Sequence, residues 1–232
     1  MTSRLHTFAN GAELAENLAD AVAVALAAGI AARGKASLAV SGGSTPKTFF
    51  RTLSTRPLDW TKVIVTLVDE RFVPADNPRS NHLLVAENLL RDAAADAVFL
   101  PLYQPVDDVE IAAAIASKEV AQIEPPFDVV ILGMGNDGHT ASFFPGGNNL
   151  ERAIDPKTPR GIVTMEAQDA GEPRLTFTFA SLEDARLLVL HIEGEAKKTV
   201  LDQALADGDE RDMPIRAMLR RASTPVDIYW AP

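Results

Sequence analysis

FDVVILGMGNDGHTASFFP, from Phe127 to Pro145, is the stretch that decides the fold. It begins with a continuous apolar run, breaks at glycines and then presents Asp137, Gly138 and His139 together. An apolar run without polar alternation is typical of a strand covered on both faces in a parallel α/β sheet. Ligands of open sheets of this kind bind outside the carboxyl ends of the strands. His139 is therefore the first candidate for catalysis.

Two other apolar runs end in polar loops in the same way. Ser37 to Val40 is followed by Ser41-Gly42-Gly43-Ser44-Thr45-Pro46, and Val63 to Val68 is followed by Asp69-Glu70-Arg71. If the three runs are neighbouring parallel strands, their carboxyl ends meet at one edge of the sheet. We therefore expect the glycine loop, the charged cluster and His139 to share one pocket.

The order of the expected elements predicts an α/β fold, a Rossmann-like sandwich with a mainly parallel sheet. Besides the three runs above, we expect strands at Arg4–Phe8, Ala185–Ile192 and Val226–Trp230. Helices are expected at about Ala12–Arg33, Pro46–Leu53, Ser80–Arg91, Asp107–Ile123, Glu195–Ala206 and Met213–Arg221. Arg174–Phe179 alternates apolar residues with threonine, so it is expected to be an antiparallel or edge strand that extends the same sheet.

The composition narrows the class of protein. A hydrophobic fraction of 47% and a charged fraction of 23% are ordinary for a soluble globular chain. No Pro/Gly/Ser-rich linker divides the chain, so residues 1–232 are expected to form a single domain. The formal net charge of −10 opposes binding to nucleic acid or to an anionic membrane. The oligomeric state is not decided by the sequence, and a monomer is favoured.

The chain contains no cysteine, which excludes disulfides, thiol nucleophiles and cysteine-ligated metals. This is compatible with the cytoplasm, the expected location. The first 20 residues lack the pattern of a signal peptide. The alanine-rich segment Ala12–Ala32 carries Glu13, Glu16 and Asp20, so it is expected to be an amphipathic helix and not a membrane span.

The glycine loop has two interpretations. Gly42-Gly43 and the hydroxyls of Ser44 and Thr45 could form a simple turn with a helix cap. The same residues at the start of a helix also leave backbone N–H groups free to bind an anion, most simply a phosphate. The loop lacks the Gly-Lys-Ser/Thr ending of a P-loop, so ATP or GTP is not implied.

A dinucleotide site is disfavoured. Gly133 to Gly138 matches G-x-G-x-x-G, but Phe143-Phe144-Pro145-Gly146-Gly147 interrupts the long helix that such a site requires.

The remaining candidates also have structural alternatives. An imidazole can take and return a proton near neutral pH, and Asp137 could orient His139, although a loop histidine can also cap a backbone group. For His6, His82 and His191 a surface or packing role is favoured.

Asp69, Arg71 and Arg79 could be solvated surface charges. Alternatively, Asp69 faces substrate hydroxyls or a proton in transfer while Arg79 closes on a phosphate. Lys197 is expected in the first turn of a helix, where a cation opposes the helix dipole, which favours a role in ligand binding.

In these motifs the chain resembles the 6-phosphogluconolactonase family, within the superfamily that also contains glucosamine-6-phosphate deaminase. The resemblance runs nearly end to end. Its most specific part is Asp137-Gly138-His139-Thr140-Ala141-Ser142. It also includes the glycine loop, Asp69-Glu70-Arg71, Arg79-Ser80-Asn81, Pro173-Arg174-Leu175-Thr176 and Gly194-x-x-Lys197.

The resemblance implies hydrolysis of 6-phospho-D-glucono-1,5-lactone, the second step of the oxidative pentose phosphate pathway, without a metal or organic cofactor. It also implies a three-layer Rossmann-like fold. The implied catalytic base is His139, with Asp69 and Asp137 as further catalytic candidates. Phosphate and sugar would be held by Gly42, Gly43, Ser44, Thr45, Arg79 and Lys197, and Arg71 and Arg174 complete the binding candidates. Phe144 stands where the family commonly has leucine, a change expected to affect packing only.

Two alternatives to the lactonase remain open. The deaminase branch typically has an Ile-Ala-Phe-Asn-Glu-Pro run after the histidine, which supplies a carboxylate, whereas Thr140 to Pro145 contains none. This difference favours the lactonase over a hexosamine-phosphate isomerase or deaminase. A sugar-phosphate sensor without catalytic activity is the other alternative.

Overall fold

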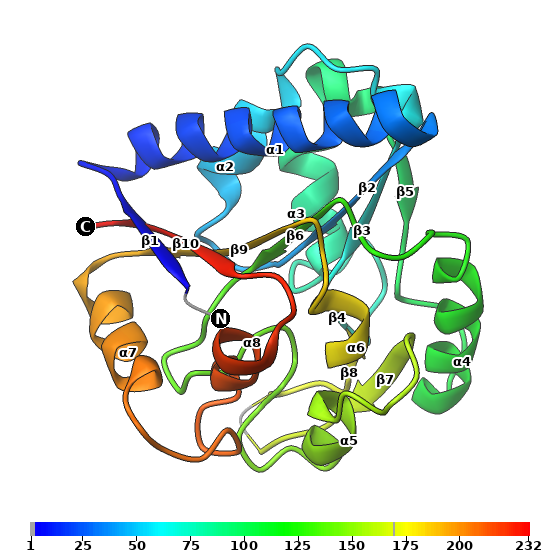
Figure 1. The fold of residues 1–232 in the computed structure, drawn as a ribbon. Coiled ribbons are helices and arrows are strands. Elements are labelled where there is room, and N and C mark those ends of the chain that lie inside the picture. Colours follow the sequence, from blue (N-terminus) through cyan, green and yellow to red (C-terminus); the bar gives the residue numbers. More distant parts are fainter. Residues whose placement is uncertain (1–2, 169) are drawn as a thin grey trace.

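The main sheet is parallel throughout (Figure 1). A computed structural model describes residues 3–168 and 170–232, and over these residues seven strands pair in the order β1-β10-β9-β6-β2-β3-β5. All six pairings are parallel, which confirms the predicted mainly parallel sheet. The strands are β1 Arg4–Thr7, β2 Ala36–Val40, β3 Val63–Leu67, β5 Val98–Leu100, β6 Val129–Leu132, β9 Leu187–Glu193 and β10 Val226–Ala231.

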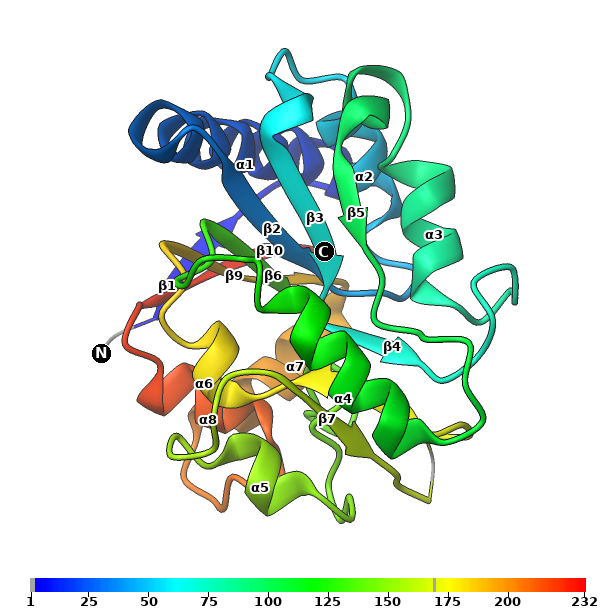
Figure 2. The ribbon, with the colours of Figure 1, turned by 90° about the vertical axis from the view of Figure 1, so that its right-hand side faces the viewer.

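Helices form the outer layers. In Figure 1, α1 and α2 lie on one side of the sheet and α4 to α8 lie on the other, and Figure 2 shows α3 beside α2. This is the three-layer arrangement expected from the alternation of strands and helices. The helices are α1 Gly11–Arg33, α2 Lys47–Ser54, α3 Asn81–Asn88, α4 Val109–Val120, α5 Leu150–Ile154, α6 Phe179–Leu182, α7 Glu195–Leu205 and α8 Ile215–Arg221, with short 3-10 helices at Trp60–Lys62 and Asp92–Asp96.

The long helix α1 has clear capping signals. The Asn10 side chain accepts a hydrogen bond from the backbone N–H of Glu13, and Gly34 closes the helix with a φ of 77°, which glycine adopts without strain. By length and composition alone, α1 is apolar enough to cross a membrane. In the structure one face of α1 is buried in the core, through side chains that recur every four residues: Leu14, Leu18, Val22 and Leu26.

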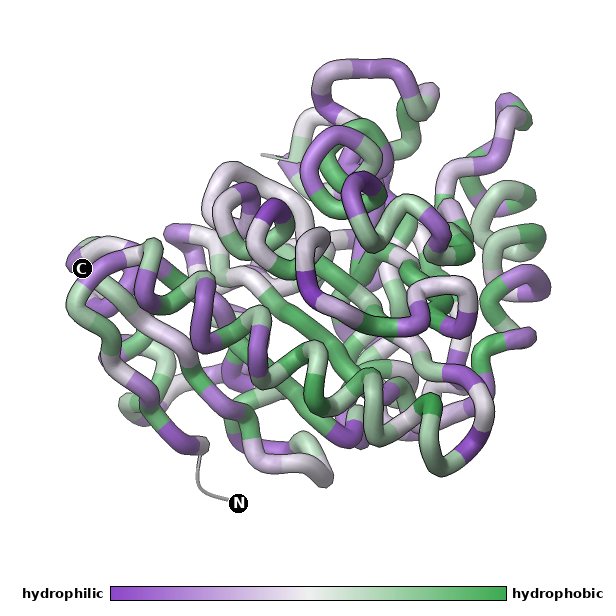
Figure 3. The backbone as a smooth tube through the Cα atoms, turned by 90° about the horizontal axis from the view of Figure 1, so that it is seen from above, coloured by the Kyte–Doolittle hydropathy of each residue, from purple (hydrophilic) through white to green (hydrophobic). Residues whose placement is uncertain are grey.

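The two central strands explain the long apolar runs in the sequence. Every residue of β2 and of β6 is buried, because helices or loops cover both faces of the sheet there. Figure 3 shows hydrophobic residues concentrated along the central strands. Full burial of a valine or leucine side chain contributes roughly 1.5–3 kcal/mol, so these strands fix the centre of the fold.

One prediction about the sheet is wrong. Arg174–Phe179 was expected to extend the main sheet, but its strand β8 (Arg174–Phe177) belongs to a separate antiparallel sheet in the order β4-β8-β7. The antiparallel direction itself is confirmed. The other strands of this small sheet are β4 Asp69–Arg71 and β7 Ile162–Met165. Asp69-Glu70-Arg71 is therefore a strand in its own right and not a loop at the end of β3.

Val68 explains why the chain leaves the main sheet at this point. Its N–H donates to the carbonyl oxygen of Val40 in the main sheet at 2.9 Å, and its carbonyl accepts from the N–H of Phe177 in the small sheet at 3.1 Å. Val68 thus connects the two sheets, and β8 pairs with β4 instead of with the outer strands β1 or β5. β5, β7, α5 and α6, which contain three to five residues each, were not predicted.

Asp128, just before β6, ties neighbouring strands together. It is 3% exposed; Oδ2 accepts from the Ser37 N–H at 2.9 Å and Oδ1 accepts from the Arg33 guanidinium.

We expect Asp128→Ala to lower the free energy of unfolding by about 2–3 kcal/mol, because the buried Ser37 N–H loses its acceptor. Urea denaturation followed by tryptophan fluorescence measures this loss. Asp20→Ala, which removes an exposed carboxylate from α1, is the control. Equal losses in the two variants would contradict the assigned role.

Candidate active site

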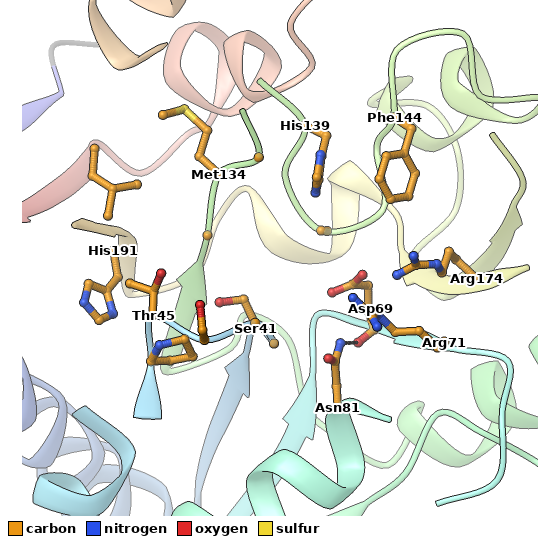
Figure 4. Close-up of a pocket in the computed structure, with 18 of the residues that line it drawn as sticks. Ser41, Thr45, Asp69, Arg71, Asn81, Met134, His139, Phe144, Arg174 and His191 are labelled. Atoms are coloured by element: carbon orange, nitrogen blue, oxygen red, sulfur yellow. Dashed lines mark hydrogen bonds between the residues drawn. The ribbon is translucent and has the colours of Figure 1, made fainter. Parts of the chain in front are cut away.

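The sites predicted from separate stretches of sequence line one cavity of about 470 Å³ (Figure 4). The cavity lies where β2, β6 and β9 end. In Figure 4 the side chains of His139, Asp69 and Arg174 point toward the same space from different segments. Of the predicted site residues the lining contains Gly42, Gly43, Ser44, Thr45, Asp69, Arg71, Arg79, His139, Arg174 and Lys197, whereas Asp137 lies behind His139. The roles of these residues stay predictions.

The glycine loop is shaped by close packing. A Cβ on Gly42 would lie 1.9 Å from Oδ1 of Asn81, so only glycine fits there. Gly43 has a φ of +93°, a conformation that side-chain-bearing residues rarely adopt. The loop then enters α2, and the start of that helix has no side-chain cap. N–H groups at an uncapped helix start are free to bind an anion in the cavity.

His139 is held in place by Asp137. Its Nδ1 lies 2.6 Å from Asp137 Oδ1, and its backbone N–H donates to the same oxygen at 3.1 Å. With Nδ1 engaged, Nε2 remains as the ring nitrogen for chemistry in the cavity. A Cβ on Gly135 would lie 2.1 Å from His139 Nδ1 and 2.5 Å from Asp137 Oδ1, so glycine is required beside the pair. The possible contact between Asp137 and His139 is thus present in the structure.

The turn after His139 is tight. Thr140 Oγ1 donates to the Gly133 carbonyl at 2.8 Å, and the Phe143 N–H donates to the Thr140 carbonyl at 2.9 Å. Ala141, between them, has a φ of +47°, a left-handed conformation that costs a non-glycine residue about 1–2 kcal/mol. The surrounding hydrogen bonds hold the turn in this conformation. As a result His139 faces the cavity while Ser142 is fully buried.

Lys197 places a cation at the cavity. It lies in the first turn of α7, as predicted, and its Nζ donates to the Met134 carbonyl at 2.7 Å and to Asn136 Oδ1 at 2.6 Å. An ammonium group has three donors, so one remains for a ligand. Burial lowers the pKa of Lys197, and the nearby Asp137 carboxylate partly offsets this effect.

Three arginines surround another part of the cavity. Arg174 is 5% exposed, donates to the carbonyls of Ala170 and Glu172, and lies over the Phe144 ring at 5.4 Å. Burial lowers the pKa of Arg174, and repulsion from Arg71 adds to this. Arg71 Nη1 donates to the carbonyl of Arg79 at 2.9 Å. The half-exposed Arg79 pairs with Glu172 at 2.8 Å. These arginines supply the local positive charge that an anionic ligand requires on an acidic chain.

The sequence reasoning missed several lining residues, among them Asn81, Met134 and His191. His191 was assigned a surface or packing role. Its ring does pack edge-on against the Phe49 ring, with centroids 5.9 Å apart, and its Nε2 lies 3.0 Å from Glu193 Oε1. Its position near the end of β9 could have marked it as a cavity residue. Phe144 was expected to affect packing only. Its ring packs against the His139 ring, with centroids 4.5 Å apart.

Fold and cavity together define an α/β protein with a cavity lined by arginine, lysine and histidine at the carboxyl ends of parallel strands. The model of one family, glucosamine-6-phosphate isomerases/6-phosphogluconolactonase, matches residues 9–230. The chain belongs to this family.

Several known proteins are similar to this chain in sequence or in structure. Over 232 residues the chain is 68% identical to a 6-phosphogluconolactonase of Rhizobium meliloti, covering 100% of both chains. A Pseudomonas aeruginosa 6-phosphogluconolactonase is 44% identical over 98% of this chain and 94% of that protein. The crystal structure of a 6-phosphogluconolactonase from Shewanella baltica superimposes with a TM-score of 0.95 at 41% identity, covering 99% and 98% of the two chains. A monomeric glucosamine-6-phosphate deaminase, at 19% identity and a TM-score of 0.80 over 98% of this chain and 97% of that one, shares the fold.

The contact between Asp137 and His139 should change the pKa of the Asp137 carboxyl group. Burial opposes ionisation of Asp137, but hydrogen bonds from the ring and backbone of His139 outweigh it, so the pKa of Asp137 lies below its ordinary value. In His139→Ala we expect the pKa of Asp137 to rise, because the ring hydrogen bond is lost. Carbon NMR titration of the carboxyl group measures this, with His6→Ala as the control. An unchanged pKa in His139→Ala would contradict the role assigned to the contact.

The same shift has a consequence for stability. A carboxyl group with a lowered pKa in the folded state stabilises the protein above the unfolded-state pKa and loses that contribution as the pH falls through the folded-state pKa. The stability that His139→Ala loses through this contact should therefore be present at neutral pH and vanish in acid. Urea denaturation of the wild type and of His139→Ala, at neutral pH and at a pH below the folded-state pKa of Asp137, tests the sign of this pH dependence.

Proposed function

We propose that this chain hydrolyses 6-phospho-D-glucono-1,5-lactone to 6-phospho-D-gluconate, the second step of the oxidative pentose phosphate pathway. The observation that carries the proposal is the full-length identity of 68% to a 6-phosphogluconolactonase. The segment Thr140 to Pro145 adds support, because it lacks the carboxylate expected of the deaminase branch. A cytoplasmic location is part of the proposal, and the absence of cysteine suits a reducing compartment.

In the proposed mechanism His139 is the general base. With Nδ1 hydrogen-bonded to Asp137, Nε2 takes a proton from water as the water oxygen attacks the lactone carbonyl carbon. The Asp137 carboxylate stabilises the resulting imidazolium, which then returns the proton to the ring oxygen as the C–O bond breaks. Water is consumed, the ring opens, and the carboxylic acid leaves. The reaction requires no cofactor.

Phosphate binding supplies positioning. The loop from Gly42 to Thr45 provides backbone N–H groups at the cavity. Lys197 and Arg79 provide cations there. Anchoring the phosphate holds the lactone near His139, which lowers the entropic part of the barrier. The donors available to the tetrahedral oxyanion are Arg174, Arg79 and the backbone N–H groups of the glycine loops.

The first experiment is a pair of assays on the purified protein. Proton release from freshly generated lactone should be accelerated above the spontaneous rate, and ammonia release from glucosamine 6-phosphate should be absent. The reverse result would favour the deaminase. Ligand binding without any acceleration would favour a sugar-phosphate sensor.

His139→Ala should lower kcat roughly 100-fold or more and change KM little, because general base catalysis is lost while the phosphate contacts remain. Steady-state kinetics on the lactone, corrected for spontaneous hydrolysis, measures both constants. His6→Ala, which changes a histidine of β1 that pairs with Asp227, is the control and should behave as the wild type. A wild-type kcat in His139→Ala would exclude the proposed base.

Lys197→Ala should mainly raise KM, by roughly tenfold or more, because a charge-assisted contact to the phosphate is lost. Lys198→Ala is the matched control: the adjacent lysine donates to Asp202 on the same helix and does not line the cavity. The same assay separates kcat from KM. If both lysine variants gave the same KM, the phosphate role of Lys197 would be wrong.

A further inference from the structure

Asp69 is an unusual carboxylate, because it is 7% exposed, lines the cavity and forms no salt bridge among residues 3–168 and 170–232. Its Oδ2 accepts a hydrogen bond from Ser142 Oγ at 2.6 Å. Within the same described residues, nothing donates to Oδ1. A carboxylate can accept about four hydrogen bonds, so this group keeps most of its accepting capacity unused. Asp69 lines the cavity, so this unused capacity faces the space that a ligand would fill.

Ser142 fixes which oxygen stays available. It is fully buried, and its single hydroxyl proton goes to Asp69. The Ser142 N–H donates to Thr176 Oγ1 at 3.3 Å, and Thr176 is the residue paired with Asp69 between β8 and β4. On the other side, Asn81 Nδ2 donates to the Asp69 backbone carbonyl at 2.9 Å. The backbone of Asp69 is therefore held by Asn81 and by pairing with β8, and its carboxylate is held by Ser142, with Oδ1 left for the cavity.

We propose that Asp69 Oδ1 accepts a hydrogen bond from a ring hydroxyl of the sugar lactone, and that Ser142 is the positioning residue that orients Asp69 for this contact. The inference rests on the proposed function. A carboxylate repels phosphate and carboxylate groups, so the neutral hydroxyls are the donors that this substrate offers it. A substrate lacking the hydroxyl leaves Oδ1 unpaired, and such sites reject the deficient analogue strongly.

The test compares binding of 6-phosphogluconate with binding of analogues that each lack one ring-derived hydroxyl, measured by calorimetry. For the wild type, at least one deoxy analogue should bind roughly tenfold or more weakly than the parent, as expected for a hydrogen bond to a charged group. In Asp69→Ala this ratio should fall to about one, because the acceptor is gone. In Ser142→Ala the ratio should shrink, because Asp69 is free to rotate away.

Ser54→Ala is the matched control. Ser54 is also fully buried, and its hydroxyl lies within hydrogen-bond distance of a carboxylate, Asp92 Oδ2 at 3.1 Å, as well as of the Arg51 carbonyl at 2.8 Å, but it does not line the cavity. It should keep the wild-type ratio. A merely structural role for Ser142 would weaken binding of the parent and all analogues alike and leave their ratio unchanged. That outcome would overturn the positioning role.

Equal binding of all analogues to the wild type would overturn the hydroxyl contact, and this part of the test needs no variant. Failure of the proposed function looks different, because the wild type would then not accelerate hydrolysis of the lactone, whether or not it binds 6-phosphogluconate. If it also failed to bind 6-phosphogluconate, the inference would fall with it. A wild type that hydrolyses the lactone but shows no discrimination keeps the proposed function and rejects only the inference.

Discussion

Val40 pairs with Ile131 and Leu132 pairs with Leu190, so β2, β6 and β9 carry their following loops to one edge of the sheet. This common register is the constraint on which the cavity depends. The strands are buried and apolar, and a slip of one residue would reverse which face each side chain occupies, so the register is strongly specified. The glycine loop after β2 and the His139 loop after β6 are brought together by core packing.

Close approach of the backbone completes the site. Gly42 leaves room for Asn81, and Gly135 leaves room for the His139–Asp137 pair, so in both loops a missing side chain creates the space that a functional group occupies. The electrostatics are local in the same way. Although the formal net charge of the chain is −10, Arg71, Arg174 and other cations line one cavity. Solvent screens the buried Arg174 less than it screens the exposed charges.

The sequence was sufficient for the parts of the site that depend on local pattern. Apolar runs ending in glycines predicted the central strands and the loops that line the cavity. Pairing between distant segments was harder, because an antiparallel strand such as β8 has no local signal for its partner. The assignment of β8 to the main sheet was therefore wrong. For the same reason the contact between Ser142 and Asp69, 73 residues apart, could not be predicted, nor could spacing alone establish the contact between Asp137 and His139.

The turn from His139 to Ser142 connects the two proposed tasks of the site. Its first residue presents the imidazole to the cavity, and its last holds the Asp69 carboxylate from behind. Ala141, between them, adopts a left-handed conformation, a cost that the fold accepts only because hydrogen bonds on both sides fix the turn. Because three peptide units join the two residues, a shift of the small sheet that moved Asp69 would also disturb the base. Under the two proposals, recognition of the sugar and proton transfer therefore depend on the same short segment of the chain.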